Sequence, residues 1–174
     1  MSGGGAPAET RVDGSGRRVA LVAARWHDEI TDALLAGAQQ ACADCGVAAG
    51  DVEVVRVPGA FELPVVALAL ARSEHVDAVV CLGVVVRGGT PHFDYVCRAV
   101  TDGCTRVALD TGVPVGFGVL TVDTVEQARA RAGGAEGDKG REAVLAALET
   151  VAVLADVRGG AHRGDGSARG TGFR

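Results

Sequence analysis

One stretch, which runs from an apolar strand into a helix start, constrains this chain more than any other. Residues 79–86 read Val-Val-Cys-Leu-Gly-Val-Val-Val, a continuous run typical of a strand buried on both faces of a sheet. Gly88 and Gly89 follow, where the backbone can turn and approach another molecule closely. Thr90 and Pro91 predict a helix start, with Thr90 as the cap and Pro91 in the first helical position. Because a helix N-terminus attracts anions, the stretch predicts an anion-binding turn.

Strand and helix patterns alternate through the rest of the chain. We expect Asp28 to cap the first helix and Gly46 to end it. Alternation of this kind implies a parallel sheet of four strands with helices on both faces, a three-layer α/β fold. The segment 133–138 is expected to be a loop. The predicted strands are 17–24, 52–57, 79–86 and 113–121, and the predicted helices are 29–45, 60–72, 92–110, 124–131 and 139–157.

The chain is expected to form one domain with two polar ends. Its 174 residues suffice for a single domain, which we place at 17–157. Residues 1–16 are rich in Gly, Ala and Ser and predict a flexible arm. Residues 158–174 are rich in Gly and Arg and predict a disordered, solvated tail.

Charge and cysteine content exclude several classes of protein. The net charge of −5 argues against nucleic-acid binding, and no apolar run is long enough to cross a membrane. The N-terminus lacks the pattern of a secretory signal, and the five cysteines are an odd number, so we expect a cytoplasmic protein with reduced thiols. The cysteines, including the Cys42 and Cys45 pair at a helix end, are interpreted as small buried hydrophobes. No ligand spacing indicates a metal site.

Aromatic and titratable residues follow the predicted strands, where parallel sheets bind ligands. Trp26 comes after the first strand, Phe61 and Glu62 come after the second, and Phe117 lies on the fourth. His92 lies beside the anion-binding turn, where its pKa near neutrality suits proton transfer. With aromatic residues only 3% of the chain, their convergence on one crevice is the main evidence for a ligand site.

Each of these residues also has an ordinary interpretation. Trp26 alone could cover the core, Phe61 and Phe117 could be core residues, and Glu62 could be a solvated carboxylate at a helix start. His92 could simply cap its helix, and the glycine turn could be an ordinary connection. Arg131 and Lys139, which flank the expected loop 133–138, are surface charges if the monomer is considered alone.

Several long motifs resemble the lumazine synthase family. They are 57–64 (Val-Pro-Gly-Ala-Phe-Glu-Leu-Pro), 82–96, 117–121, 126–128, 131–133 and 138–140, and the resemblance extends over about residues 17–157. It implies a flavodoxin-like fold and the condensation of 5-amino-6-(D-ribitylamino)uracil with 3,4-dihydroxy-2-butanone 4-phosphate. The product would be 6,7-dimethyl-8-ribityllumazine, the precursor of riboflavin. No metal or organic cofactor would be needed.

The resemblance implies a role for each matching residue. His92 would be the proton-transfer residue. The pyrimidine and ribityl contacts would be Trp26, Ala60, Phe61, Glu62, Val84, Val85, Val86, Phe117 and Lys139. The phosphate contacts would be Gly89, Thr90 and Arg131. Trp26 stands where many members have Phe, and His27 stands where Asn is frequent, which puts one hydrogen bond to the ring in doubt.

The family's site lies between neighbouring subunits of a pentamer. Phe117, Arg131 and Lys139 would therefore come from the adjacent chain. Family members stop at pentamers or build icosahedral shells, and the short segment 133–138 favours the shell. The resemblance also makes riboflavin synthase a candidate partner.

Two other classes of function remain open at this point. A lumazine- or flavin-binding shell protein without turnover would keep the crevice and the subunit contacts. An electron carrier of the flavodoxin type would bind flavin mononucleotide.

Overall fold

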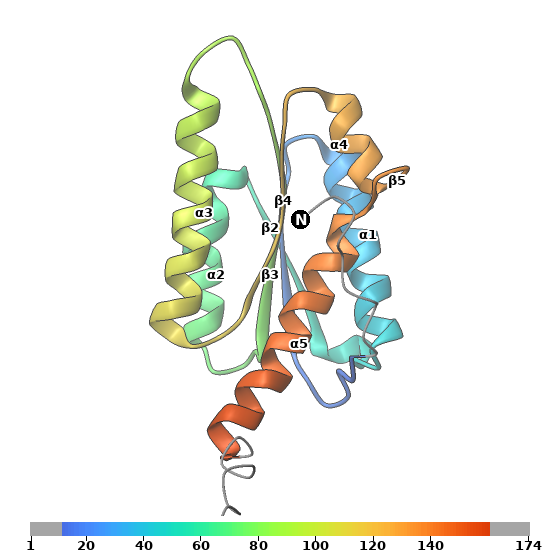
Figure 1. The fold of residues 1–174 in the computed structure, drawn as a ribbon, viewed down its shortest axis with the longest axis vertical. Coiled ribbons are helices and arrows are strands. Elements are labelled where there is room, and N and C mark those ends of the chain that lie inside the picture. The colour runs from blue at the N-terminus through green and yellow to red at the C-terminus, as the bar shows by residue number, and fades with distance from the viewer. Residues whose placement is uncertain (1–11, 161–174) are drawn as a thin grey trace, which may run out of the picture.

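The computed structural model describes residues 12–160, which form a parallel sheet between two layers of helices (Figure 1). The four main strands lie in the order β2-β1-β3-β4. The predicted three-layer α/β fold is confirmed. The elements of the layers are β1 (Val19–Ala24), α1 (Asp28–Asp44), β2 (Val52–Val57), α2 (Leu63–Arg72), β3 (Ala78–Val86), α3 (His92–Thr111), β4 (Val115–Val122), α4 (Val125–Arg131) and α5 (Lys139–Gly159). Short additions are two 3-10 turns, Ala49–Asp51 and Ala60–Glu62, and two short strands, β5 (Ala132–Gly134) and β6 (Gly137–Asp138).

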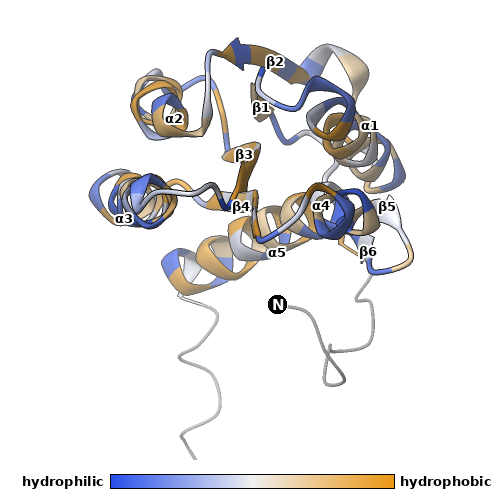
Figure 2. Cartoon of the chain, turned by 90° about the horizontal axis from the view of Figure 1, so that it is seen from above, coloured by the Kyte–Doolittle hydropathy of each residue, from blue (hydrophilic) through white to orange (hydrophobic). Residues whose placement is uncertain are grey.

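The two central strands are the most apolar and the most buried. All six residues of β1 are buried, and β3 is buried from Ala78 to Val84. Figure 2 shows β3 in orange between α2 and α3 on one side and α1, α4 and α5 on the other. The edge strands β2 and β4 are partly exposed. The valine-rich run therefore forms an inner strand because helices cover both of its faces.

Alternate residues of β3 enter two different cores. Val80 and Leu82 pack with the α1 and α5 side, whereas Val79 and Cys81 pack with the α2 and α3 side. Helix α5 approaches α1 closely at Gly140, where a Cβ atom would collide with the backbone carbonyl of Leu34. The two cores hold the sheet rigidly and so fix the positions of its strand ends.

The ends of several helices follow local sequence chemistry. The Thr124 hydroxyl caps α4 by accepting a hydrogen bond from the Gln127 N–H. Gly46, with φ of 83°, ends α1, and its N–H donates to the Ala43 carbonyl. Gly112, with φ of 70°, ends α3 in the same left-handed conformation.

Two expected helix starts are wrong by one residue. His27, with φ of 56°, is the N-cap of α1, and Asp28 already lies inside the helix, where its carboxylate accepts from the Glu29 N–H. Pro91 is the N-cap of α3 and not its first residue, and no side chain caps that helix. The Asp94 N–H donates instead to the Pro91 carbonyl, so the backbone of Pro91 takes the place expected for the Thr90 side chain.

The segment 133–138 is not a loop. Residues of β5 and β6 pair as a short antiparallel hairpin that joins α4 to α5. At the N-terminal side of the domain, the N–H of the buried Gly14 donates to the Cys45 carbonyl, so residue 14 of the expected arm contacts the domain. Arg158 lies within α5, and its guanidinium donates to the Gly112 carbonyl. The rest of the expected arm and tail, 1–11 and 161–174, lies outside the described residues.

Four of the five cysteines are buried, as interpreted, whereas Cys97 is only half-buried. Burial raises the pKa of the Cys42 thiol to about 11, which keeps it protonated and inert. Within residues 12–160, no helix is long and apolar enough to cross a membrane, and no cluster of His, Cys, Asp and Glu has the arrangement of a metal site.

Candidate active site

The carboxyl ends of the four main strands lie at one end of the domain, where α3 and α4 begin (Figure 1). Pairing continues one residue beyond two of these strands. The Arg25 N–H donates to the Val57 carbonyl, and the Arg87 N–H donates to the Val122 carbonyl. The connections that follow the strands therefore leave the sheet at aligned positions. We call the residues predicted for the site at this end the strand-end half-site: Trp26, Ala60, Phe61, Glu62, Val84, Val85, Val86, Gly89, Thr90 and His92.

Trp26 and Glu62, from different connections, approach the same glycine. A Cβ atom at Gly59 would lie 3.2 Å from Glu62 Oε2 and 3.4 Å from Trp26 Cδ1. Trp26 is 72% exposed and Phe61 is 62% exposed, while Ala60 is buried. Exposure of two large aromatic side chains beside a carboxylate leaves ring surface for stacking and an acceptor for hydroxyl groups.

The end of β3 offers backbone groups to a ligand. The pairing of β3 with β4 continues to Val86, which is opposite Val122. The recorded pairing of β3 with β1 ends at Leu82, opposite Ala23. Across residues 84–86, one edge of β3 therefore pairs with β4, and within residues 12–160 the other edge pairs with no strand. Amide and carbonyl groups on that edge can hydrogen-bond to the edge of a flat heterocycle.

The turn after β3 is open and leads into the start of α3. Gly88, Gly89, Thr90 and His92 are all exposed, and no atom outside the immediate neighbours lies within 4 Å of where a Cβ atom of either glycine would stand. The α3 helix has 20 residues, so the partial positive charge at its N-terminus is well developed. Amide groups at a helix start can bind an anion, and His92 is the first residue of α3.

Arg87 is a residue of this end to which sequence reasoning gave no role. Its Nε lies 2.9 Å from Asp123 Oδ1 and its Nη1 lies 3.4 Å from Asp94 Oδ1. Its guanidinium also lies over the Phe93 ring, 4.1 Å from the centroid. The hydrogen bond to Asp123, followed by the charges of the two carboxylates, raises the pKa of Arg87. Asp123 is 36 positions away from Arg87 in the sequence, and so no local spacing could have revealed this contact.

Phe117 does not lie at the strand ends of its own chain. It pairs with Cys81, whereas the end of β4 is Val122, which pairs with Val86. At about 3.3 Å per residue, Phe117 is roughly 16 Å below the end of the strand. It is 42% exposed on an edge strand. The expectation that Phe117 enters the crevice of its own chain is therefore wrong, because the residue is too early in β4.

The contacts of Arg131 and Lys139 are also with residues outside the strand-end half-site. Arg131 ends α4, and its Nη1 donates to the Gln127 carbonyl of the same helix, 3.0 Å away. Lys139 begins α5, is only 15% exposed and places its Nζ 2.7 Å from both carboxylate oxygens of Glu142. The two residues flank the β5–β6 hairpin in the chain, and Figure 1 shows β5 beside α1 and α4, on the face of the sheet opposite α2 and α3. We call Phe117, Arg131 and Lys139 the outlying group.

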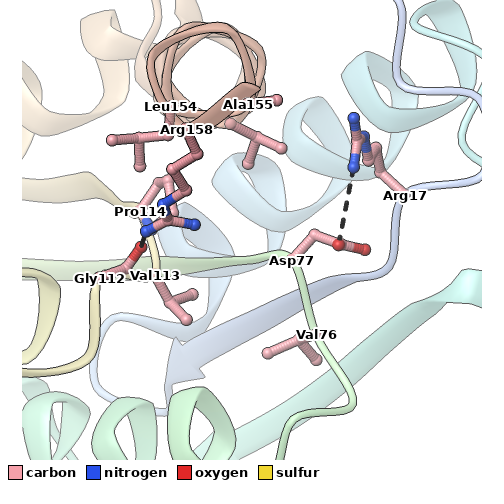
Figure 3. A pocket seen from close by; sticks show the side chains of 10 residues that line it. Arg17, Val76, Asp77, Gly112, Val113, Pro114, Leu154, Ala155 and Arg158 are labelled. Carbon is pink, nitrogen blue, oxygen red and sulfur yellow. Dashed lines mark hydrogen bonds and ion pairs between the residues drawn. The ribbon is translucent and has the colours of Figure 1, made fainter. Parts of the chain in front are cut away.

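A cavity of about 190 Å³ lies at the other end of the sheet (Figure 3). Val76 and Asp77 from before β3, Val113 and Pro114 from before β4, and Arg158 from the end of α5 line it. In Figure 3, Arg17 and Arg158 stand on opposite sides of it, with Asp77 between them. None of the predicted site residues lines this cavity. The strand-end half-site is instead an open surface in a single chain.

The fold and the half-site define a class of protein: a three-layer α/β domain that presents aromatic surface, a carboxylate, an exposed glycine turn and an imidazole at its strand ends. A family model described as 6,7-dimethyl-8-ribityllumazine synthase matches residues 16–155. Curated proteins of that name from Frankia casuarinae and Kineococcus radiotolerans are 67% and 66% identical, and the matches cover 90% of this chain and 98% and 96% of theirs. One from Streptomyces avermitilis is 55% identical over 90% of this chain and 97% of its own. The chain belongs to the 6,7-dimethyl-8-ribityllumazine synthase family, which confirms the resemblance found in the sequence.

Proposed function

We propose that this protein is an enzyme that condenses 5-amino-6-(D-ribitylamino)uracil with 3,4-dihydroxy-2-butanone 4-phosphate to give 6,7-dimethyl-8-ribityllumazine. The observation that carries this function is the family match, which covers every residue of the strand-end half-site and of the outlying group. The reaction is a transferase step of riboflavin biosynthesis. We place the enzyme in the cytoplasm, where it would act on small-molecule substrates.

The pyrimidine substrate is assigned to the aromatic part of the half-site. Trp26 stacks on the ring, and the exposed edge of Val84–Val86 supplies backbone hydrogen bonds to it. Phe61 and Glu62 hold the ribityl chain, with the Glu62 carboxylate accepting from its hydroxyl groups, and Ala60 forms the floor. The support for this assignment is the closeness of Trp26 and Glu62 at Gly59 together with the unpaired edge of β3.

The phosphorylated substrate is assigned to the turn after β3. Gly89 and Thr90 bind the phosphate through the amide groups that precede and begin α3, and Arg131 adds a second positive group. His92 lies within two residues of Thr90, so it can transfer protons close to the reacting carbons. An anion-binding turn and an imidazole in one stretch match the needs of a substrate that loses phosphate.

The chemistry requires positioning and proton transfer more than a strong nucleophile. The amine of the pyrimidine attacks the ketone, and the resulting carbinolamine loses water to give an imine. A proton is then removed from the carbon next to the imine, and its electron pair forms a C=C bond as the C–O bond to phosphate breaks and phosphate leaves with the electrons of that bond. The enol that results takes up a proton on its terminal carbon and becomes the second carbonyl. The ribitylamino nitrogen closes the ring on the second carbonyl, and another water leaves. His92 can donate or accept the protons in these steps, while the turn holds the departing phosphate.

The outlying group is assigned to the half-site of a neighbouring subunit. Phe117, Arg131 and Lys139 do not reach the strand ends of their own chain, yet they match the family's site. A homo-oligomer in which one chain's outlying group meets the next chain's half-site would complete the site. A pentamer provides such head-to-tail contacts, and pentamers can assemble further into an icosahedral shell. The exposed Trp26, Phe61 and Phe117 are the large apolar side chains that such a contact would cover.

Three further assignments complete the proposal. The catalytic domain extends over residues 17–157, with a flexible arm at 1–16 and a solvated tail at 158–174. Neither a metal nor an organic cofactor takes part. Riboflavin synthase, which would consume the product, is the candidate protein partner.

The test is the rate of product formation. The two substrates are mixed with the protein, and the fluorescence of the lumazine product is followed against the slow spontaneous reaction without protein. We expect a rate well above the spontaneous one. A rate equal to the spontaneous one, with product still bound by the protein, would instead identify a binding protein without turnover. Bound flavin mononucleotide absorbing in the visible range would indicate an electron carrier.

A further inference from the structure

The turn Gly88–Pro91 has few contacts that could hold it in one conformation. Among residues 12–160, no hydrogen bond joins Gly88, Gly89 or Thr90 to another element. The positions where Cβ atoms of the two glycines would stand are open. Glycine has the largest conformational freedom of all residues, so such a turn would have to be ordered each time an anion binds. We therefore looked for a neighbouring residue whose contacts fix the positions of the two ends of the turn.

Arg87 touches the elements at both ends of the turn. Its backbone N–H donates to Val122 at the end of β4, and its Nε donates to Asp123 one residue later. Its Nη1 reaches Asp94, which lies in the first turn of α3, and its guanidinium covers the ring of Phe93. The side chain thus joins the end of the sheet to the start of the helix that carries His92.

The contacts of Arg87 argue against a direct role in binding an anion. Two carboxylates flank the guanidinium, so the local charge of the three groups together is negative. An incoming phosphate would have to compete with both acids for the same donors. The pairs are also exposed, and exposed pairs contribute little to the stability of a fold. What remains is geometry: a planar guanidinium fixes the relative position of the groups that it contacts.

We propose that Arg87 is a positioning residue that clamps the start of α3 to the end of β4, and so presets the Gly88–Thr90 turn and His92 for the phosphorylated substrate. The proposal rests on the proposed function, because it assigns that substrate to the turn. Asp123 and Asp94 are the two anchor points of the clamp. Presetting the turn lowers the entropy that substrate binding must remove.

The first test compares Arg87→Met with Arg106→Met. Arg106 is a matched control because it forms an exposed pair with Asp110 farther along the same helix. We expect Arg87→Met to raise KM for the phosphorylated substrate by roughly five- to tenfold and KM for the pyrimidine by less than about twofold. Arg106→Met should change neither value. Equal changes in both KM values, or none, would contradict the clamp.

The conservative variants separate a clamp from a simple charge effect. Arg87→Lys keeps the charge but loses the planar fork, so it should restore KM only in part. Asp123→Asn removes a negative charge near the turn. If charge alone mattered, this variant would bind the phosphorylated substrate more tightly, whereas a broken anchor makes binding weaker. Full rescue by Arg87→Lys together with tighter binding by Asp123→Asn would overturn the proposal.

A second measurement tests whether Arg87 orders the turn, and it does not depend on enzyme activity. Hydrogen exchange is followed by mass spectrometry in peptides that cover residues 88–96 of the full-length protein. Arg87→Met should speed exchange there roughly fivefold, and Arg106→Met should leave it unchanged. If the unaltered protein forms no product, the proposed function is refuted, and the hydrogen-exchange comparison still tests the role of Arg87. Unchanged exchange in Arg87→Met would refute the clamp whatever the enzyme does.

Discussion

The strand-end half-site and the outlying group differ in how the fold positions them. The half-site comes from consecutive strand ends, and the register of a rigid parallel sheet brings Trp26, Glu62 and His92 to one end of the domain. The outlying group comes from the middle of an edge strand and from the two sides of a hairpin, and Arg131 and Lys139 bond to Gln127 and Glu142, outside the half-site. A single chain therefore organises only part of the proposed site. The difference is the reason for our proposal that a neighbouring subunit completes it.

The largest effect is expected at Arg131. Arg131→Ala should lower kcat/KM for the phosphorylated substrate roughly 100-fold, because a charged donor to phosphate is lost, and should act mainly through KM. Arg129→Ala is the matched control, since Arg129 lies on the same helix and pairs with Glu29 at the surface. Steady-state kinetics, with each substrate varied in turn, will give kcat and KM for both variants. If the apparent affinity for the phosphorylated substrate does not change in Arg131→Ala, the phosphate assignment is wrong.

His92→Ala should have a smaller effect, roughly tenfold on kcat, because the substrates supply most of the reactivity and the histidine only transfers protons. His75→Ala serves as the control, because His75 is exposed and belongs to the connection that leads into the amino-terminal end of β3. The kcat values are measured at saturating concentrations of both substrates. A His92→Ala variant as fast as the His75→Ala variant would remove His92 from the mechanism.

The effect of replacing Trp26 on KM for the pyrimidine should depend on whether the new side chain keeps an aromatic ring. Trp26→Ala removes the stacking surface and should raise KM for the pyrimidine roughly tenfold. Trp26→Phe keeps an aromatic face and should change that KM by only about twofold. Binding of the product lumazine, followed by fluorescence, checks the same contact without catalysis. Equal losses in the two variants would show that the indole acts through something other than stacking.

The smallest effect concerns the start of α4, one residue after Asp123. Thr124→Ala removes the cap of α4 and should lower the free energy of unfolding by about 1 kcal/mol. Thr150→Ala is the control, because the Thr150 hydroxyl bonds only to a carbonyl of its own helix. Thermal unfolding of both variants measures the difference. Equal stability of the two would mean that the cap seen at Thr124 does not contribute.

Much of the fold was predictable because its signals are local. The apolar run 79–86 predicts β3, and the glycines at 46 and 112 mark the ends of α1 and α3. The left-handed His27 was not predictable, since residues other than glycine rarely adopt positive φ and nothing nearby in the sequence demands it. The β5–β6 hairpin was missed because its strands are too short and too rich in glycine to show alternation.

The site was predictable to the extent that the sheet alone positions it. Trp26, Phe61 and His92 directly follow strands, so alternation of elements is enough to bring them to one end. The position of Phe117 depends on strand register, and the contact of Arg87 with Asp123 depends on which strands are neighbours. Neither property is visible in residue spacing. The family resemblance supplied the outlying group, which the residues themselves did not indicate.

Mixed oligomers test the central claim, that neighbouring subunits share the site. A Trp26→Ala/His92→Ala double variant and Arg131→Ala are unfolded, mixed in equal amounts and refolded together. If sites form between chains, activity should rise to roughly a quarter of the unaltered value by random pairing. The same quarter is expected when a variant with all three substitutions is mixed with the unaltered protein. No recovery in the first mixture and about half activity in the second would show that each chain forms its own site.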